Sequence, residues 1–203
     1  MTGGGRDLRD LLGRLPLAQS ALEYAERQHA GQLRQVDGAP FILHPLEVAT
    51  LLYAAGAADH VIAAGLLHDT VVKTGTTVDD LRSRFGPAVA TVVAAVSEDE
   101  HLRGYQRRKA ALRSQVADGG RDALTVFAAD KISKVRELRI DPPEHRDPAA
   151  ARRKQRRRLV HYGECLELLE LELTDSPLVG QLATELTSVA EASRREPATV
   201  GAA

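Results

Sequence analysis

Three short segments of the chain carry nitrogen and oxygen metal ligands within apolar sequence. His44 follows Phe-Ile-Leu and precedes a proline, His68 and Asp69 stand side by side after "AAGLL", and Asp130 lies in "VFAADKI". A carboxylate among apolar residues is costly unless it is paired or bound to a metal ion. Two imidazoles and two carboxylates suit Mn²⁺, Fe²⁺ or Zn²⁺ better than Ca²⁺. The pattern indicates a divalent transition-metal site made by these four residues.

The same residues also have a purely structural interpretation. A single histidine is most often a satisfied core or surface residue, and a His-Asp dipeptide often occurs by chance. Asp130 and Lys134 are four residues apart, which is the spacing of an ordinary ion pair on a helix surface. The spacing of the residues leaves both interpretations open.

The elements that position these side chains are all expected to be helices. Aromatic residues make up 3% of the 203 residues and tryptophan is absent, which favours a helical core over a sheet. We predict one all-α domain over residues 13–192, a bundle of about eight to ten helices, between a flexible N-terminus (1–12) and a flexible tail (193–203). Apolar periodicity predicts helices over 17–31, 44–56, 58–74, 77–86, 87–99, 104–118, 121–138, 149–173 and 176–192.

Two helix starts have recognisable caps. Thr77 is followed three residues later by Asp80, which resembles a capping box. Asp59 stands at the start of the predicted helix 58–74, where an aspartate would accept hydrogen bonds from the first free backbone N–H groups.

Charge and composition exclude several classes of protein. The formal net charge is −1, so no overall field attracts nucleic acids or membranes, and no apolar run is long enough to span a bilayer. A single cysteine, Cys165, excludes an internal disulfide and fits the reducing cytoplasm. No Gly-rich phosphate loop or nucleophile elbow is present. We expect a cytoplasmic protein that binds a small ligand rather than nucleic acid and that could form a homo-oligomer.

Three separated motifs together resemble the HD-type hydrolase domain of RelA/SpoT proteins. They are "HAGQLRQVDGAPFILHPLEVATLL", "VIAAGLLHDTV" followed by "TGTTVDDLRSRFGPAVATVV", and "VFAADKISKVREL". Over residues 17–170, their order and spacing are most similar to the small stand-alone alarmone hydrolases. The resemblance implies an all-α HD-superfamily fold and removal of the 3′-pyrophosphate of (p)ppGpp. It also implies Mn²⁺ bound by His44, His68, Asp69 and Asp130.

The chain departs from this family pattern at the residues that handle protons. Where the family has a Glu-Asp pair after the His-Asp ligands, this sequence has Val72 and Lys73, and Lys134 replaces the family asparagine four residues after the last ligand. Loss of one positioned acid or base typically lowers a rate ~10²–10⁴-fold. Each lysine shares a helical face with a ligand. The lysines therefore either point at the site and hold a phosphate, or extend outward to solvent.

Basic and aromatic residues matched to the family imply where a nucleotide would bind. Arg34, in "HAGQLRQ", matches an arginine that stacks on the base, for which a planar guanidinium is suited. Arg158 and Tyr162 match a pair that faces substrate phosphate and sugar, and Arg108 and Lys109 match basic residues near the site. The rest of the basic run "ARRKQRRR" is expected to be a solvated helix face.

Two functions are compatible with these residues. The first is a metal-dependent nucleotide (pyro)phosphohydrolase that acts on (p)ppGpp or on a related nucleotide such as (p)ppApp or NADPH, with Lys73 and Lys134 on phosphate oxygens. The second is a catalytically impaired pseudo-hydrolase that binds metal and an alarmone or nucleotide as a regulatory module. The complete ligand set favours the enzyme, whereas the missing Glu-Asp pair favours the module.

Overall fold

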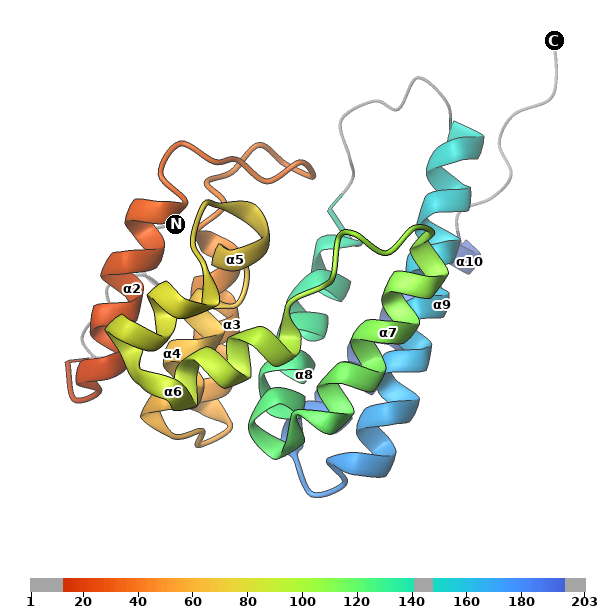
Figure 1. Ribbon diagram of the computed structural model, residues 1–203. Helices are drawn as coiled ribbons and strands as arrows, with labels where there is room; N and C mark the ends of the chain where they lie inside the picture. Colours follow the sequence, from red (N-terminus) through yellow and green to blue (C-terminus); the bar gives the residue numbers. More distant parts are fainter. Residues whose placement is uncertain (1–12, 141–147, 196–203) are drawn as a thin grey trace, which may run out of the picture.

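Every regular element in the part of the chain that the structure describes is a helix. The computed structural model describes residues 13–140 and 148–195, arranged as Figure 1 shows. The helices are α2 (Pro16–Gln28), α3 (Leu43–Ala54), α4 (Asp59–Leu67), α5 (Thr70–Lys73), α6 (Val78–Val96), α7 (Tyr105–Asp118), α8 (Gly120–Glu137), α9 (Pro148–Glu172) and α10 (Pro177–Arg195). The prediction of an all-α fold is confirmed.

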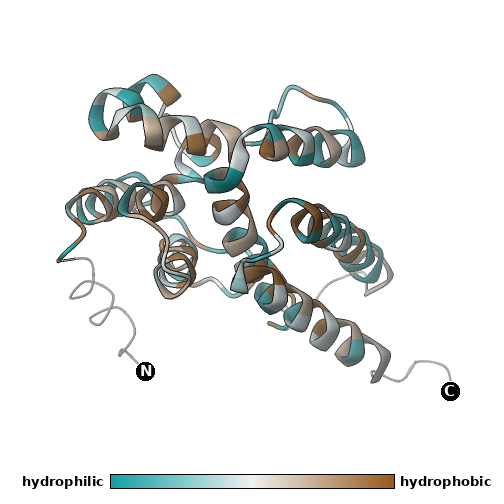
Figure 2. Cartoon of the chain, turned by 90° about the horizontal axis from the view of Figure 1, so that it is seen from below, coloured by the Kyte–Doolittle hydropathy of each residue, from teal (hydrophilic) through white to brown (hydrophobic). Residues whose placement is uncertain are grey.

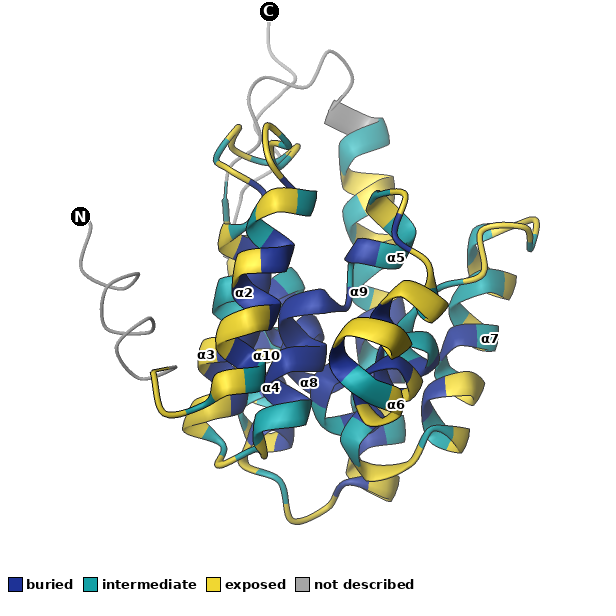
Figure 3. Cartoon of the chain, turned by 60° about the vertical axis from the view of Figure 1, so that its left-hand side comes forward, coloured by how far each residue is buried: buried dark blue, intermediate teal, exposed yellow. Residues whose placement is uncertain are grey.

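Helices α4 and α8 form the centre of the bundle. All residues of α4 from Val61 to Leu67 are buried, as is every residue of α8 from Val126 to Ser133, and Figure 3 shows both helices enclosed by the others. α4 packs against α2, α3, α6 and α8, while α8 also packs against α3, α6, α7, α9 and α10. A helix that is apolar on all sides is expected at the core of a bundle. The side chains that lie within these two helices, or directly after them in the chain, are therefore held in fixed positions.

The outer helices bury one face only. In α2 the buried residues are Ala18, Ala21, Leu22, Tyr24 and Ala25, the spacing of a single helical stripe. Figure 2 shows hydrophilic and hydrophobic residues alternating around these outer helices. The free cysteine, Cys165, is buried within the bundle, as is usual for this small apolar side chain.

A glycine in α4 allows α3 to approach closely. A Cβ atom at Gly65 would lie 2.3 Å from Leu52 Cδ1 and 3.3 Å from Val48 Cγ1 of α3, and both of these side chains are fully buried. A larger residue at this position would have to displace the Leu52 methyl group and press on Val48, and a packed core has little space to absorb this. Gly65 therefore sets the short distance between the helices that present the two candidate histidine ligands.

The predicted helix 58–74 is broken at the candidate ligands. α4 ends at Leu67, and α5 begins at Thr70. The His68 ring hydrogen-bonds the carbonyl oxygen of Gly65 at 2.8 Å, and the Thr70 hydroxyl donates to that of Leu67 at 2.7 Å. Side chains that bond nearby carbonyls compete with the helical backbone ladder. The prediction of one continuous helix was wrong, and the break turns His68 and Asp69 toward the bundle interior.

The two predicted caps have different outcomes. Thr77 and Asp80 form a reciprocal capping box at the start of α6, as predicted. Asp59 does not cap α4. Its carboxylate instead accepts hydrogen bonds from the backbone N–H groups of Leu17 (3.1 Å) and Ala18 (2.8 Å). Asp59 therefore caps the neighbouring helix α2, which ties the first helix of the bundle to the central one.

The predicted boundary between helices 77–86 and 87–99 appears as a kink within α6. Gly86 has φ +86° and is the non-helical residue there, and Pro87 follows it. Residues with positive φ favour glycine, and the proline suits the first turn of the next helical segment. The sequence signals for the end of one helical segment and the start of the next were therefore correct, although the two segments follow each other directly within α6.

The predicted terminal segments lie largely outside the described residues. Residues 1–12 are outside them, and α10 continues to Arg195, so that only residues 196–203 of the expected tail are outside them. None of the described helices combines the length and the hydrophobicity needed to cross a membrane.

Candidate metal centre

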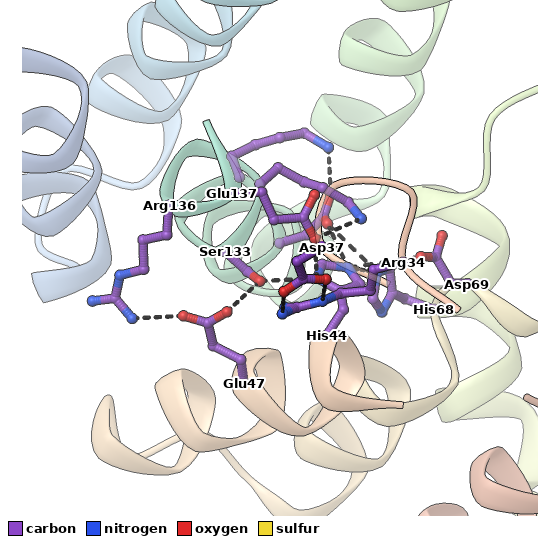
Figure 4. Close-up of polar contacts among 12 residues, drawn as sticks. Arg34, Asp37, His44, Glu47, His68, Asp69, Ser133, Arg136 and Glu137 are labelled. Atoms are coloured by element: carbon purple, nitrogen blue, oxygen red, sulfur yellow. Dashed lines mark hydrogen bonds and ion pairs between the residues drawn. The ribbon is translucent and has the colours of Figure 1, made fainter. Parts of the chain in front are cut away.

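Four side chains from three regions of the chain meet at the end of α4. His44 Nε2 lies 3.1 Å from His68 Nε2 and 3.2 Å from Asp130 Oδ1. Asp69 Oδ2 lies 3.7 Å from the first of these nitrogens and 3.6 Å from the second. His44, His68 and Asp130 each offer a ligand atom within 4.8 Å of the others. Figure 4 shows His44, His68 and Asp69 in this arrangement. The residues predicted as ligands from sequence are therefore brought together.

Hydrogen bonds leave the inward-facing nitrogen of each histidine available to an ion. His68 Nδ1 donates to the carbonyl oxygen of Gly65. Ser133 Oγ donates its single proton to Glu47 Oε2 at 2.6 Å, so it accepts from His44 Nδ1 at 2.9 Å. A ligating histidine usually donates its other N–H in this way. Both Nε2 atoms therefore face the centre of the site.

Two carboxylate oxygens support a cation at this position. Asp69 Oδ2 and Asp130 Oδ1 are buried and accept no hydrogen bond within the described residues. Buried polar atoms are normally satisfied, and an unpaired buried carboxylate oxygen is expensive. Both oxygens point at the same two imidazoles. The donor set of two nitrogens and two oxygens fits a divalent transition-metal ion.

The protonation states also suit an ion. Burial, followed by the nearby Lys134 ammonium, lowers the pKa of His44, so its ring is neutral. Burial opposes ionisation of Asp69, but His68 and Lys134 outweigh it and lower its pKa to about 2. Burial would lower the pKa of His68, but Asp69 reverses the direction and raises it. Metal ligands must be deprotonated, and among these three residues only the pKa of His68 is shifted in the direction that favours a proton over an ion.

A buried lysine holds the second oxygen of Asp130. The Lys131 ammonium pairs with Asp130 Oδ2 and lies 4.2 Å from the centroid of the Phe127 ring. Burial would raise the pKa of Asp130, but the charge of Lys131 outweighs it and keeps this pKa well below its usual range. Lys131 thus fixes one oxygen of the carboxylate and leaves Oδ1 directed at the histidines.

A chain of polar contacts extends outward from His44. Ser133 bonds Glu47, whose other oxygen accepts from Arg136 Nη1 at 2.8 Å, and Arg136 Nε donates to Glu185 of α10 at 2.8 Å. Figure 4 shows Glu47 between Ser133 and Arg136. Outer partners of this type fix the orientation of a ligating ring. The contacts link α3, α8 and α10 to the position of one imidazole.

Glu47→Gln should weaken metal binding without removing a ligand. The amide keeps the shape of the side chain but loses the charge that orients Ser133, and loss of such outer partners typically costs about 10- to 100-fold in metal affinity. Titration with Mn²⁺, with the free ion followed by electron paramagnetic resonance, measures the change. Glu191→Gln, at an exposed position on α10, is the matched control. An unchanged affinity in Glu47→Gln would show that the contacts to His44 do not position it.

Three of the four side chains, His68, Asp69 and Asp130, line a polar cavity of about 360 Å³, and His44 is fully buried against His68. Seven cationic side chains and four carboxylates line it, together with histidine, tyrosine and aliphatic residues. The chain has five lysines against 22 arginines, and all five lysines line this cavity: Lys73, Lys109, Lys131, Lys134 and Lys154. A chain of net charge −1 therefore gathers positive charge at one place. Such a cavity would concentrate anionic ligands.

Most of the predicted substrate residues reach this cavity. Lys73, Lys109, Lys134, Arg158 and Tyr162 all line it, as does Val72, which stands where the family pattern has Glu. Arg158 Nη2 donates to the Tyr162 hydroxyl at 3.3 Å, so the predicted pair is in contact. Within the run "ARRKQRRR", Lys154, Arg157 and Arg158 line the cavity, and Arg152, Arg153 and Arg156 do not; of these six residues, all but Arg158 are largely exposed. The expected solvated face thus accounts for only part of the run.

Two predicted substrate residues lie elsewhere. Arg34 pairs with Asp37 of its own loop and is not among the residues that line the cavity. Arg108 donates to Glu98 Oε1 at 2.8 Å and borders a neighbouring hollow. Lys109 pairs with the other oxygen of the same Glu98, so this carboxylate is part of the cavity wall.

Several residues at the site were missed by sequence reasoning. Lys131, Ser133 and Glu47 were not predicted, nor was Tyr105, whose ring lies 4.1 Å from the Arg157 guanidinium in the cavity wall. Lys131 had a usable signal, because a lysine within the apolar run "FAADKI" needs a buried partner. Ser133 and Glu47 had none, since their contact joins positions 86 residues apart.

Comparisons with known proteins show which family the chain belongs to. The sequence profile of the HD domain matches residues 21–156. The chain is 37% identical over 127 residues to human guanosine-3′,5′-bis(diphosphate) 3′-pyrophosphohydrolase MESH1, covering 61% of this chain and 70% of the human protein. It is also 37% identical over 133 residues to a probable GTP pyrophosphokinase of Mycobacterium leprae, but it spans only 17% of that protein.

A solved structure has the same fold. It is that of a metazoan ortholog of SpoT, with a TM-score of 0.73 and 24% sequence identity, covering 87% of this chain and 95% of the other. The HD profile covers most of the chain, and the human relative aligns over most of its own length. The chain belongs to the HD domain family, in its RelA/SpoT-type branch.

Proposed function

We propose that the protein is a metal-dependent nucleotide pyrophosphohydrolase whose substrate is guanosine 3′,5′-bis(diphosphate) or a related nucleotide. The observation that carries this proposal is that three of the four candidate ligands, His68, Asp69 and Asp130, line the same cavity as all five lysines. A substrate with several phosphate groups would neutralise that charge. The human and mouse relatives are named as hydrolases of this compound, which supports the same substrate class.

The proposed ligands of the ion are His44, His68, Asp69 and Asp130, and Mn²⁺ is the ion that we propose. When bound there, a divalent ion would polarise a phosphoryl oxygen and lower the pKa of a coordinated water. The protein's own contribution is positioning: Ser133 and Gly65 fix the two imidazoles. Because these ligands are already fixed in position, they would need little reorientation during the reaction.

The cavity wall beyond the ligands would bind the nucleotide. Lys73 comes from α5 and Lys134 from α8, while Lys109 comes from α7 and Arg158 and Tyr162 come from α9, and all five line the cavity. We assign phosphate oxygens to the lysines and the Arg158–Tyr162 pair to phosphate and sugar. Arg34 would have to release Asp37 in order to stack on a base, so its predicted role requires a rearrangement of its loop.

A binding module is the second candidate function. Val72 lies in the cavity wall, one turn after Asp69, and carries no acid or base. Lys73 follows it, so the two positions where the family pattern has Glu and Asp offer no carboxylate to the reaction. This observation favours a protein that retains the ion and the nucleotide but turns over slowly.

His68→Ala should abolish release of pyrophosphate from guanosine 3′,5′-bis(diphosphate) in the presence of Mn²⁺. The change removes one of two nitrogen ligands, so both ion binding and hydrolysis should be lost. His60→Ala is the matched control, because His60 lies at the opposite end of α4, is paired with Asp122 and does not line the cavity. Hydrolysis is followed by pyrophosphate release, and binding by equilibrium titration.

The same experiment separates the two candidate functions. Hydrolysis by the unchanged protein that is lost in His68→Ala and retained in His60→Ala supports the enzyme. Tight binding of the nucleotide with recovery of the intact compound supports the binding module. Hydrolysis that persists in His68→Ala would contradict the proposed metal centre.

A further inference from the structure

Two lysines from different helices converge on one aromatic ring. Lys73 Nζ lies 5.0 Å from the centroid of the Phe41 ring, and Lys134 Nζ lies 5.7 Å from it. Phe41 is buried, and its ring centroid is 5.8 Å from that of His44. Both ammonium groups are therefore held beside the metal centre, and both line the same cavity.

The loop that carries Phe41 is braced against α5. Gln32 Nε2 donates to the backbone carbonyl of Lys73 at 3.1 Å, and the Phe41 N–H donates to the carbonyl of Gln32 at 2.8 Å. The His29 ring also hydrogen-bonds Gln32 Oε1 at 3.0 Å and lies 4.8 Å from the Phe41 ring. These contacts fix the ring and the end of α5 relative to each other, so the approach of the two lysines is built into the fold.

The two ammonium groups are incompletely neutralised. Lys134 Nζ is 3.8 Å from Glu137 Oε1, whereas Lys73 forms no ion pair with any described residue. The attraction of a cation to an aromatic face is only about 0.5–1 kcal/mol at exposed sites, and like charges near each other repel. Two ammonium groups beside the candidate site for a divalent cation would weaken the binding of that cation, unless an anion lies between the ammonium groups and the cation.

We propose that Lys73 and Lys134, which both lie against Phe41, bind phosphate beside the candidate metal centre, and that they make the binding of the divalent ion and of phosphate mutually dependent. The inference rests on the proposed metal centre and goes beyond it. In the absence of phosphate, the lysines repel the ion. With phosphate bound, its charge attracts both the lysines and the ion.

Mutual dependence is reciprocal by thermodynamic necessity. If phosphate raises the affinity for the ion by some factor, the ion raises the affinity for phosphate by the same factor, and such factors are commonly about 5- to 150-fold. The replacement of the family acid pair by Val72 and Lys73 would then have a specific consequence. It would favour retention of the phosphate-containing ligand or product over activation of water.

Titration of the full-length protein with Mn²⁺, with and without inorganic phosphate, tests this proposal. Electron paramagnetic resonance reports the free aqueous ion directly, and protein-free titrations correct for ion–phosphate complexes in solution. The unchanged protein should bind Mn²⁺ about tenfold or more tightly when phosphate is present. The Lys73→Gln/Lys134→Gln variant should bind Mn²⁺ alone more tightly than the unchanged protein and should lose the response to phosphate.

Two further variants make the result specific. Arg82→Gln/Arg84→Gln removes the same charge from two exposed positions of α6 and should respond to phosphate like the unchanged protein. Lys73→Arg/Lys134→Arg retains both charges and should keep the response, which shows that charge rather than folding is measured. No effect of phosphate on the unchanged protein, or a full effect in the double Gln variant, overturns the inference.

The outcome is independent of catalysis. A clear response to phosphate with no hydrolysis of any nucleotide leaves this inference standing and rejects the enzyme. Hydrolysis with no response to phosphate rejects this inference and supports the enzyme.

Discussion

The Val72→Glu/Lys73→Asp variant should hydrolyse guanosine 3′,5′-bis(diphosphate) about 10²-fold or more faster than the unchanged protein. Val72 lines the cavity, and it lies three residues beyond Asp69, so a carboxylate there would extend toward the reacting phosphate. General acid or base groups typically contribute 10²–10⁴-fold to a rate. The substitution also removes one of the two ammonium groups beside the metal centre.

The measurement is the rate of pyrophosphate release at saturating Mn²⁺. Val72→Gln/Lys73→Asn is the matched control, because it has nearly the same shape, removes the same lysine and supplies no acid or base. A gain in the acidic variant alone would show that proton transfer limits the unchanged protein. Equal gains in both variants would assign the effect to removal of Lys73. No gain in either would contradict the view that these two positions limit turnover.

The fold could be predicted from the sequence because its helices have strong local signals. The apolar run from Val61 to Leu67 and the striped pattern of α2 are properties of contiguous residues. The capping box at Thr77 and the stop at Gly86 are equally local. The break between α4 and α5 was missed, because it depends on hydrogen bonds from His68 and Thr70 to carbonyls that the helix would otherwise use.

The convergence of the candidate metal ligands could be predicted in part for a different reason. His44, His68, Asp69 and Asp130 were identified because ligand-type residues stand out in apolar sequence and match a family pattern in order. Their convergence depends on tertiary packing, above all on the close approach of α3 and α4 at Gly65. The match could not show that Arg34 pairs within its own loop.

Contacts that cross the bundle had no sequence signal. Asp59 caps α2 from a position 42 residues away from Leu17, and Glu47 bonds Ser133 across 86 residues. The sequence indicated Asp59 as a cap of its own helix and gave Glu47 no role, so neither long-range contact could be predicted. Neighbouring positions can mislead as well. Asp130 and Lys134 have the spacing of an ion pair, yet Asp130 pairs with Lys131, the adjacent residue, and Lys134 with Glu137.

Lys131→Met should destabilise the protein by about 3–5 kcal/mol in the absence of metal, the usual cost of removing one partner of a buried ion pair. The side chains of Lys131 and Asp130 are only 8% and 12% exposed, so the carboxylate would remain charged and unpaired, or would have to take up a proton. Urea unfolding measures the loss. Lys154→Met, on the exposed part of α9, is the control and should change stability little.

Added Mn²⁺ should restore more stability to Lys131→Met than it gives to the unchanged protein. An ion that binds only the folded state stabilises it in proportion to the logarithm of its concentration over the dissociation constant, and an Asp130 without its lysine would bind the ion more tightly. The Asp130→Asn/Lys131→Met variant has neither charge, so it should be more stable than Lys131→Met in metal-free buffer and should respond weakly to Mn²⁺. Equal stabilisation of all three proteins would place the ion away from Asp130, because only a cation beside that carboxylate can substitute for the missing ammonium.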